Sequence, residues 1–274
     1  MGVPGLWHEL ADAGIDCTLA ELAWEHWSTN ETPQRLFRVG IDATLWLYHA
    51  RKAQGGKNPA LRSLFFRLAR LLKLPILPIF VLDGAERPKL KRDTVVYTGA
   101  HAIQAQFCAM LDAFHYAYWT APAEAEAELA WMNRAGFIDA VLTDDVDALL
   151  FGAQVVVRNR AWRDDADDDD VDTAAVYDIR KGTWLIDADG MVLVAILSGA
   201  DYDTQGMFRC GVKVGQSTHT DGPWLGPRWF GNTSARYIPA HISQGDRCRY
   251  SIEGMGTISW AMACRCLCRT CDEC

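Results

Sequence analysis

The sequence lacks the long apolar segment that a membrane-spanning helix requires. Its longest apolar stretch, L-P-I-L-P-I-F-V-L at 74–82, is too short to cross a bilayer and contains two prolines. The N-terminus has no basic segment followed by an apolar one, and Leu6 stands where a myristoylation signal requires Ser or Thr. We therefore expect no membrane partner and an intracellular protein, whose 274 residues, half of them apolar, suffice for a sizeable core.

Several common catalytic motifs are also missing. The chain has no G-x-x-x-x-G-K-[ST], no H-E-x-x-H and no G-x-S-x-G, so P-loop, zincin and α/β-hydrolase chemistry have no support. Cysteine is scarce along most of the chain, because only Cys17, Cys108 and Cys210 lie in the first 210 residues. They show no paired spacing, so we expect reduced core thiols rather than a disulfide framework.

Positive charge is concentrated in one region, although the whole chain carries a net charge of -8. Residues 35–92 contain thirteen Lys or Arg against three acidic residues. A basic region of this kind is suited to binding a polyanion such as nucleic acid. For the amphipathic segment 62–73 taken alone, a solvated helix face explains the charges equally well.

Strand and helix patterns alternate along the chain. The predicted strands cover 36–41, 75–82 and 138–142, with weaker signals at 117–120, 154–158 and 175–179. The predicted helices cover 62–73, 101–114 and 123–135. This alternation predicts an α/β fold with a central, mostly parallel sheet flanked by helices.

Acidic residues stand where these apolar segments stop. They are Asp42, Asp83 and Asp201 and the acids within A-P-A-E-A-E-A-E at 121–128 and T-D-D-V-D at 143–147. The carboxyl ends of parallel strands lie at one edge of a sheet, so carboxylates that are distant in sequence converge there. Hard divalent cations are held by such oxygens, and the pattern therefore predicts metal-dependent chemistry.

Each acidic group has a simpler explanation when taken alone. Asp42 is suited to cap a helix at 43–51, and Asp83 to begin a D-G turn. The acids at 121–128 suit the first turn of a helix, and those at 143–147 suit an exposed turn. We expect a solvated loop at 163–172 and a tight turn at D-A-D-G, 187–190, rather than calcium sites.

Six motifs, in order, resemble the XPG/flap-endonuclease family of structure-specific 5' nucleases. They are M-G-V-P-G-L-W, G-I-D-A-T-L-W-L-Y, F-V-L-D-G-x-x-x-P-x-L-K, T-A-P-A-E-A-E-A-E-L-A, V-L-T-D-D-V-D-A-L-L-F-G and L-S-G-A-D-Y. The segments A-E-A-E-L-A-W-M-N and G-A-D-Y-D-T-Q-G-M are most similar to its fungal Holliday-junction-resolvase branch. The resemblance covers residues 1–214 and implies a PIN-like 5' nuclease fold.

Carried over residue by residue, the resemblance implies a site for two Mg2+ ions, with Mn2+ as a substitute. The implied ligands are Asp42, Asp83, Glu124, Glu126, Asp145, Asp147 and Asp201. Lys91 matches the lysine that reaches the scissile phosphate, where its charge offsets the charge of the transition state. The segment around Gly2 matches a part that packs near the active site, and Val3, Leu6 and Trp7 are either core residues or a base-stacking wedge.

The resemblance also divides the chain. It implies an N-terminal nuclease region at 1–95, an internal nuclease region at 96–200 and the start of a helix-two-turns-helix module at 201–214, which is cut short. Residues 215–274, which end in C-R-C-L-C-R-T-C-D-E-C, look like translated non-coding sequence rather than a zinc-binding tail. The segment T-V-V-Y-T-G-A-H-A after Lys91 also lacks the basic residues that the family usually carries on its arch helix.

The expected function is that of a Mg2+-dependent, structure-specific 5' endodeoxyribonuclease acting on flapped or branched DNA. The resemblance implies a role in DNA repair and recombination in the nucleus, and it leaves open whether the protein is a dimer on four-way junctions. The alternative is a truncated, non-catalytic protein that binds DNA or folds poorly. A single-strand ribonuclease of related α/β architecture fits the acidic residues but not the six ordered motifs.

Overall fold

The computed structural model describes residues 2–29, 35–88, 90–91, 94–95, 103–159, 173–181, 188–201, 204–207 and 210–212. All of them belong to the unit Met1–Thr220, the first of the two units into which the chain divides. The acidic block at 163–172, the tail at 215–274 and most of the arch segment lie outside the described residues. No helix in the described part of the chain is long and apolar enough to cross a membrane.

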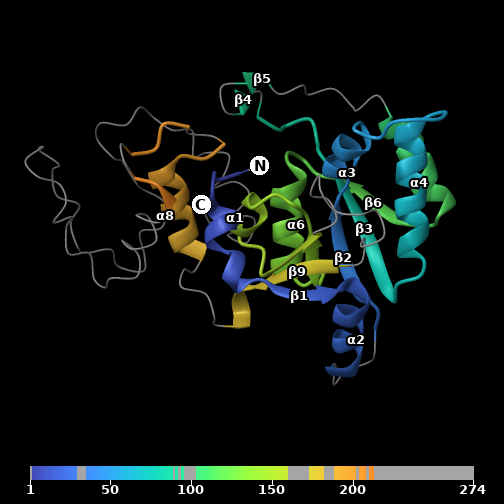
Figure 1. Ribbon diagram of the computed structural model, residues 1–274, viewed down its shortest axis with the longest axis horizontal. Coiled ribbons are helices and arrows are strands. Elements are labelled where there is room, and N and C mark those ends of the chain that lie inside the picture. Colours follow the sequence, from blue (N-terminus) through green and yellow to red (C-terminus); the bar gives the residue numbers. More distant parts are fainter. Residues whose placement is uncertain are drawn as a thin grey trace, which may run out of the picture. The chain divides into compact units, whose positions relative to one another are not determined.

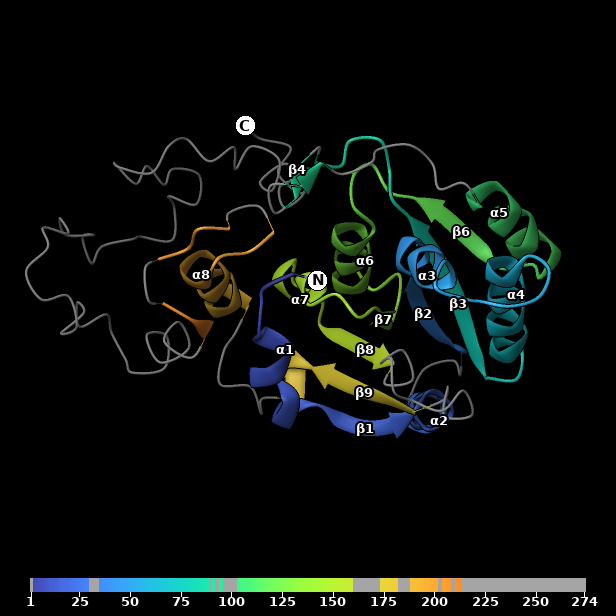
Figure 2. The ribbon, with the colours of Figure 1, turned by 45° about the horizontal axis from the view of Figure 1, so that its top comes forward.

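A mixed sheet of seven strands, in the spatial order β1-β9-β8-β7-β2-β3-β6, forms the centre of this unit (Figure 2). Five neighbouring strands run parallel: β2 (Phe37–Asp42), β3 (Ile76–Leu82), β6 (Ala117–Thr120), β7 (Ala140–Leu142) and β8 (Val155–Asn159). At the other edge, β9 (Thr173–Asp178) is antiparallel to β8, and β1 (Ile15–Thr18) is antiparallel to β9. The predicted α/β fold is confirmed, and only the short strands β1, β4 (Leu90–Lys91) and β5 (Thr94–Val95) had no sequence signal.

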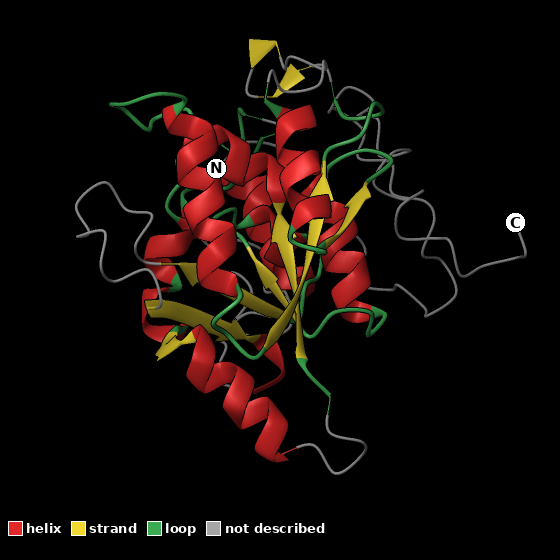
Figure 3. Cartoon of the chain, turned by 90° about the vertical axis from the view of Figure 1, so that its right-hand side faces the viewer, coloured by secondary structure: helices red, strands yellow, loops and turns green. Residues whose placement is uncertain are grey.

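Helices cover both faces of the sheet (Figures 1 and 3). One face packs against α2 (Leu19–Thr29), α3 (Ala43–Ala50), α4 (Pro59–Leu71) and α5 (Gln104–Ala113). The other face packs against α1 (Leu6–Glu9), α6 (Ala125–Arg134), α7 (Asp147–Leu150) and α8 (Ala188–Ser198). Two short 3-10 helices, Ala11–Ala13 and Ile179–Lys181, complete the described elements.

The strands divide their apolar side chains between two separate cores. In β7, Ala140 and Leu142 belong to the core under α2–α5, whereas Val141 belongs to the core under α1 and α6–α8. This alternation follows from the two-residue period of a strand. Because both faces are covered at the centre of the sheet, β7 is buried and apolar throughout, as expected for a strand of a parallel sheet.

An ion-pair network links the beginnings of β2 and β7, at the end of these strands remote from the acidic residues. Asp139 accepts hydrogen bonds from Arg35 and Arg38, including a pair from Arg35 at 2.5 and 2.7 Å. Burial opposes the charge on Asp139, but the hydrogen bonds from Arg35 and Arg38 outweigh it and lower its pKa. The network therefore fixes the register of the two strands that carry Asp42 and the 143–147 turn.

Predicted element boundaries differ from the structure by a few residues, and two of the differences have a clear structural basis. Helix α6 begins at Ala125 rather than at 123, because the carbonyls of Pro122 and Ala123 accept hydrogen bonds from Glu86 and Gly84. The D-A-D-G segment is not a tight turn over 188–190, since those residues form the first turn of α8. The apolar residues after Gly190 continue this helix, which packs in the core under α1 and α6–α8, called the second core below.

The first prediction concerns Gly84, whose backbone lies directly against the carbonyls of Ala121 and Pro122. A Cβ atom at Gly84 would collide with these backbone atoms, which cannot rotate away. We expect Gly84→Ala to lower the free energy of unfolding by about 1–3 kcal/mol in a denaturant titration. The matched control is Gly211→Ala, where an added Cβ meets nothing within 4 Å. Equal stability of the two variants would contradict the close packing of residues 83–86 on 121–123.

Candidate active site

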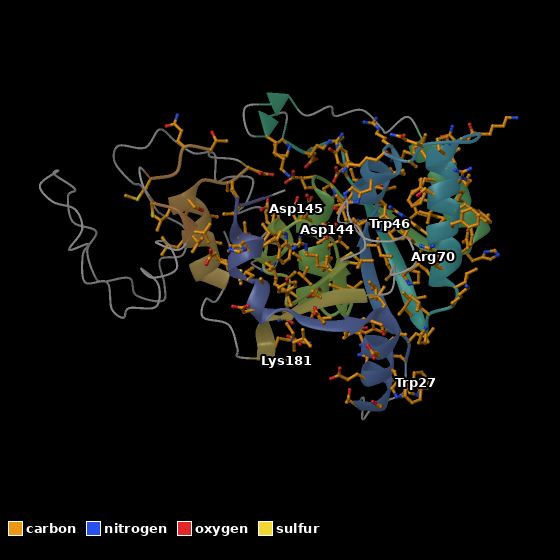
Figure 4. The ribbon with its side chains drawn as sticks, in the orientation of Figure 1. Trp27, Trp46, Arg70, Asp144, Asp145 and Lys181 are labelled. Carbon is orange, nitrogen blue, oxygen red and sulfur yellow. The ribbon has the colours of Figure 1, made fainter. Side chains whose placement is uncertain are left out.

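Four adjacent parallel strands end at the same edge of the sheet, and an acidic residue follows or ends each one. From β7 across β2 and β3 to β6, these residues are Asp145, Asp42, Asp83 and Glu124. Figure 4 labels Asp145 and its neighbour Asp144 close to α6 and α1. The edge thus collects carboxylates from segments that are more than a hundred residues apart in sequence.

All seven predicted acidic residues lie in one electrostatically connected cluster, the acid cluster. Six of them are buried: Asp42, Glu124, Glu126, Asp145, Asp147 and Asp201. Asp83, the seventh, is partly buried, and its charge acts on Asp42 and Glu124. The charges of Asp145 and Asp201 act in turn on Asp147. The structure therefore brings together every acidic residue that the resemblance selects.

The eighth predicted residue, Lys91, lies inside the acid cluster. Its Nζ is 2.9 Å from Glu124 Oε1, 3.5 Å from Asp201 Oδ2 and 3.7 Å from Glu126 Oε1. Burial alone would lower the pKa of Lys91, but the charges of Glu126 and Glu124 outweigh it and raise the pKa. The ammonium group is therefore a permanent internal counter-ion for the surrounding carboxylates.

The positive charge of Lys91 does not by itself keep all the carboxylates of this cluster in their ionised form. Burial, reinforced by the charge of Asp83, raises the pKa of Asp42 to about 8. Burial, reinforced by Asp145 and Asp201, likewise raises the pKa of Asp147 to about 8. Burial also raises the pKa of Glu124 and Glu126, despite the opposing charge of Lys91. Additional positive charge at this edge would restore the ionised form of these groups.

Asp42 performs the capping role predicted for it as well as joining the cluster, whereas Asp83 binds the first turn of α6 instead of beginning the predicted D-G turn. Asp42 Oδ1 accepts a hydrogen bond from Leu45 N at 2.9 Å and so caps α3. Asp83 Oδ1 accepts one from Ala125 N at 2.9 Å, in the first turn of α6. Asp83 Oδ2 accepts another from Arg87 at 2.7 Å. Arg87 was missed in the sequence, although its position four residues after Asp83 was an available signal.

The 143–147 turn, T-D-D-V-D, presents free carboxylate oxygens to the site. Asp145 N donates to Thr143 Oγ1 at 3.1 Å, and Asp147 N donates to Asp145 Oδ1 at 3.2 Å. Asp145 Oδ2 and Asp147 Oδ1 are buried without a hydrogen-bond partner. A buried carboxylate oxygen without a partner is costly, and a hard cation satisfies it.

The donor set fits a divalent cation, but the site is not a preassembled cage. Within the described ranges, no three acidic, histidine or cysteine side chains are arranged to hold one ion by themselves. The position of Lys91 Nζ among Glu124, Glu126 and Asp201 accounts for this, because the ammonium group already occupies the space between them. The buried, unpartnered oxygens of the 143–147 turn are the part of the donor set whose need for a partner a cation would satisfy.

The N-terminal segment covers the 143–147 turn. Gly2 has φ of +81°, and an added Cβ would lie 2.6 Å from Val146 Cγ1 and 2.8 Å from Asp145 Oδ1. Val3 and Leu6 are fully buried in the second core, so they are core residues rather than a base-stacking wedge. The expected packing of the N-terminus near the acidic residues is therefore present.

Comparison with protein families and known proteins gives consistent matches. Residues 1–101 match the XPG N-terminal domain, and residues 115–201 match the XPG I-region. The mouse protein named flap endonuclease GEN homolog 1 is 31% identical over 230 residues, covering 76% of this chain and 24% of the relative. Its human counterpart is 33% identical over 192 residues, covering 62% of this chain and 21% of the relative.

Solved structures share the fold. A crystal structure of the Holliday junction-resolving enzyme GEN1 with product DNA and Mg2+ has a TM-score of 0.66 and 34% identity, covering 80% of this chain and 51% of that chain. The catalytic core of Rad2 in complex with DNA substrate has a TM-score of 0.63 and 26% identity, covering 80% and 68%. The chain thus spans about a quarter of the curated GEN relatives and about half of the GEN1 chain.

The second prediction is a fall in stability with rising pH when divalent cations are removed. Asp42 and Asp147 have pKa values of about 8 in the folded chain, so the folded state binds more protons than the unfolded state between about pH 4 and 8. Their stabilising contribution is complete below pH 4 and is lost as the pH rises through 8. In EDTA, the free energy of unfolding obtained from thermal melts should be lower at pH 8 than at pH 5 by at least about 1 kcal/mol. Asp147→Asn should reduce this difference. A Tm that rises from pH 5 to pH 8 in EDTA, by the same amount in the wild type and in Asp147→Asn, would contradict the prediction.

The third prediction concerns Lys91. Removing the internal counter-ion leaves the buried carboxylates uncompensated, so we expect Lys91→Met to lower the unfolding free energy in EDTA by about 3 kcal/mol. Lys181→Met is the matched control, because Lys181 is half-exposed and lies 4.0 Å from the exposed Glu25, where ion pairs contribute about 0–1 kcal/mol (Figure 4). Denaturant titrations of both variants measure the difference. If Lys91→Met is as stable as Lys181→Met, the ammonium group does not balance the cluster.

Proposed function

The chain belongs to the XPG family, and on this basis we propose that it is a structure-specific DNA endonuclease that hydrolyses phosphodiester bonds. The observation that carries this proposal is the cluster of seven carboxylates, six of them buried, with Lys91 among them at the carboxyl edge of the sheet. The charge distribution supports it, because the basic region at 35–92 supplies positive charge for a polyanion. The relatives support DNA as the substrate, since both GEN1 and Rad2 have been solved with DNA.

We assign the divalent metal site to the acid cluster, with Asp42, Asp83, Glu124, Glu126, Asp145, Asp147 and Asp201 as the residues that hold two Mg2+ ions. Two ions of this type supply a nucleophile at neutral pH and stabilise the attacking and leaving oxygens. The unpartnered Asp145 Oδ2 and Asp147 Oδ1 support this assignment. GEN1 structures containing Mg2+, or both Mg2+ and Mn2+, support the choice of metal and Mn2+ as its substitute.

The chain's own residues have distinct roles in this proposal. Lys91 carries its charge into the centre of the site and offsets the negative charge that develops on the scissile phosphate. Asp42 and Asp83 are held by the first turns of α3 and α6, which orients their carboxylates before any ligand arrives. The buried position of the cluster limits the access of bulk water and strengthens these charge interactions.

The finer specificity remains part of the proposal. We assign the substrate to 5' flaps or branched junctions, and the protein to DNA repair and recombination in the nucleus. GEN1 is described as a Holliday junction-resolving enzyme and the curated GEN relatives as flap endonucleases, which supports both substrate types. The division into nuclease regions 1–95 and 96–200, followed by the start of a helix-two-turns-helix module at 201–214, remains a prediction.

A second candidate is a non-catalytic protein that binds DNA. It is favoured by the residues from Gly215 onward, whose sequence departs from the family pattern. All seven acidic residues and Lys91 are nevertheless present and gathered at one edge, which favours the enzyme.

The fourth prediction is Mg2+-dependent incision of end-labelled 5'-flap and four-way-junction DNA near the branch point. The double variant Asp145→Asn, Asp147→Asn removes both charges of the 143–147 turn and should lower the rate by more than about 100-fold. Asp12→Asn, which removes an exposed charge on a 3-10 helix, is the matched control and should cleave normally.

The outcomes separate the two candidates. Cleavage that is lost in the double variant alone supports the endonuclease, and the label at the 5' or 3' end reports the polarity of incision. A folded wild-type chain that binds the junction without cleaving it supports the non-catalytic candidate.

A further inference from the structure

Trp7 forms a contact with the 143–147 turn that the function assigned above does not use. Its indole Nε1 donates a hydrogen bond to the backbone carbonyl of Asp144 at 2.8 Å, across 137 residues of sequence. That carbonyl belongs to the peptide unit whose nitrogen is the amide of Asp145. The hydrogen bond therefore acts on the backbone immediately before a buried carboxylate that has a free oxygen.

Arg158, near the end of β8, contacts both Trp7 and Asp144. Its guanidinium lies over the Trp7 ring at 4.6 Å, and its Nε is 3.4 Å from Asp144 Oδ1. Arg158 thus binds both the ring that donates the hydrogen bond and the residue that accepts it. Such a stacked and paired arginine is held more rigidly than an arginine in either contact alone.

The Trp7 ring is held against a third element as well. The ring of Tyr177 on β9 packs against it at a centroid distance of 4.8 Å, and Tyr177 is itself buried. The ring position is thus set by β9 and by Arg158, while the indole N–H fixes Asp144. Asp144 is not among the implied metal ligands, and this arrangement gives it a separate role.

We propose that Trp7, Arg158 and Asp144 are positioning residues, which hold the 143–147 turn so that the free oxygens of Asp145 and Asp147 face a divalent cation. This inference rests on the proposed function only in taking these two carboxylates as metal ligands. Residues that orient metal ligands typically change metal affinity or activity by about 10- to 100-fold when they are replaced. A contact that merely stabilised the fold would change the Tm without changing the affinity for metal.

The test is Mn2+ binding by the full chain without DNA, followed through the electron paramagnetic resonance signal of free Mn2+. Trp7→Phe retains a ring for Arg158 and Tyr177 but loses the N–H donor, and it should weaken Mn2+ binding by about 5- to 10-fold. Trp24→Phe, at a largely exposed tryptophan of α2, is the matched control and should bind as the wild type does. In cleavage assays, Trp7→Phe should require more Mg2+ for half-maximal rate but regain the wild-type rate at saturating Mg2+.

Arg158→Gln and Asp144→Asn provide a second route, because each removes one charge of the ion pair while leaving the core side chains intact. We expect both to weaken Mn2+ binding with a change in Tm of less than about 2 °C. Unchanged Mn2+ binding in Trp7→Phe or in both of these variants would overturn the inference, as would a wild-type chain that binds no Mn2+. A wild-type chain that binds Mn2+ without cutting DNA would instead contradict the endonuclease alone, and the variants would still decide the positioning role.

Discussion

Repulsion between carboxylates buried at one edge of the sheet is the constraint on which the rest of this structure depends. In the described part of the chain, most of the buried charged residues lie there, and the partly buried Lys91 places its ammonium group among Glu124, Glu126 and Asp201. Burial, reinforced by the neighbouring carboxylates, raises the pKa of Asp42 and Asp147, and the charge of Lys91 does not offset these effects. A protein gains no stability from such an arrangement, so the cluster is best understood as a site that accepts further positive charge.

The scaffold around the cluster is built to resist this repulsion. Two separate cores, one on each face of the sheet, fix the strands from which the acidic residues project. The loop after β3 is locked against the segment before α6 by backbone hydrogen bonds at Gly84 and Glu86. The ion pairs of Asp139 hold β2 and β7 together at their opposite ends. Rigid support of this kind keeps like charges close, which flexible loops could not do.

The N-terminal segment contributes to the site more than its position in the sequence suggests. Gly2 packs against Asp145 and Val146, and Trp7 binds the backbone of Asp144. Residues at the beginning of the chain therefore complete a turn formed by residues 143–147. The matches at 1–101 and at 115–201 are consequently two parts of one site, and neither part contains the whole acid cluster.

The sequence by itself determined the alternation of strands and helices, and the ordered motifs identified the seven acidic residues and Lys91. It could do so because burial on both faces makes parallel strands apolar and because their carboxyl ends must meet at one edge. Only the tertiary structure decided that Lys91 lies between Glu124 and Asp201, that Asp83 pairs with Arg87, and that Trp7 and Arg158 hold Asp144. Most of these contacts join residues that are far apart in sequence, and their geometry depends on packing that no local pattern encodes.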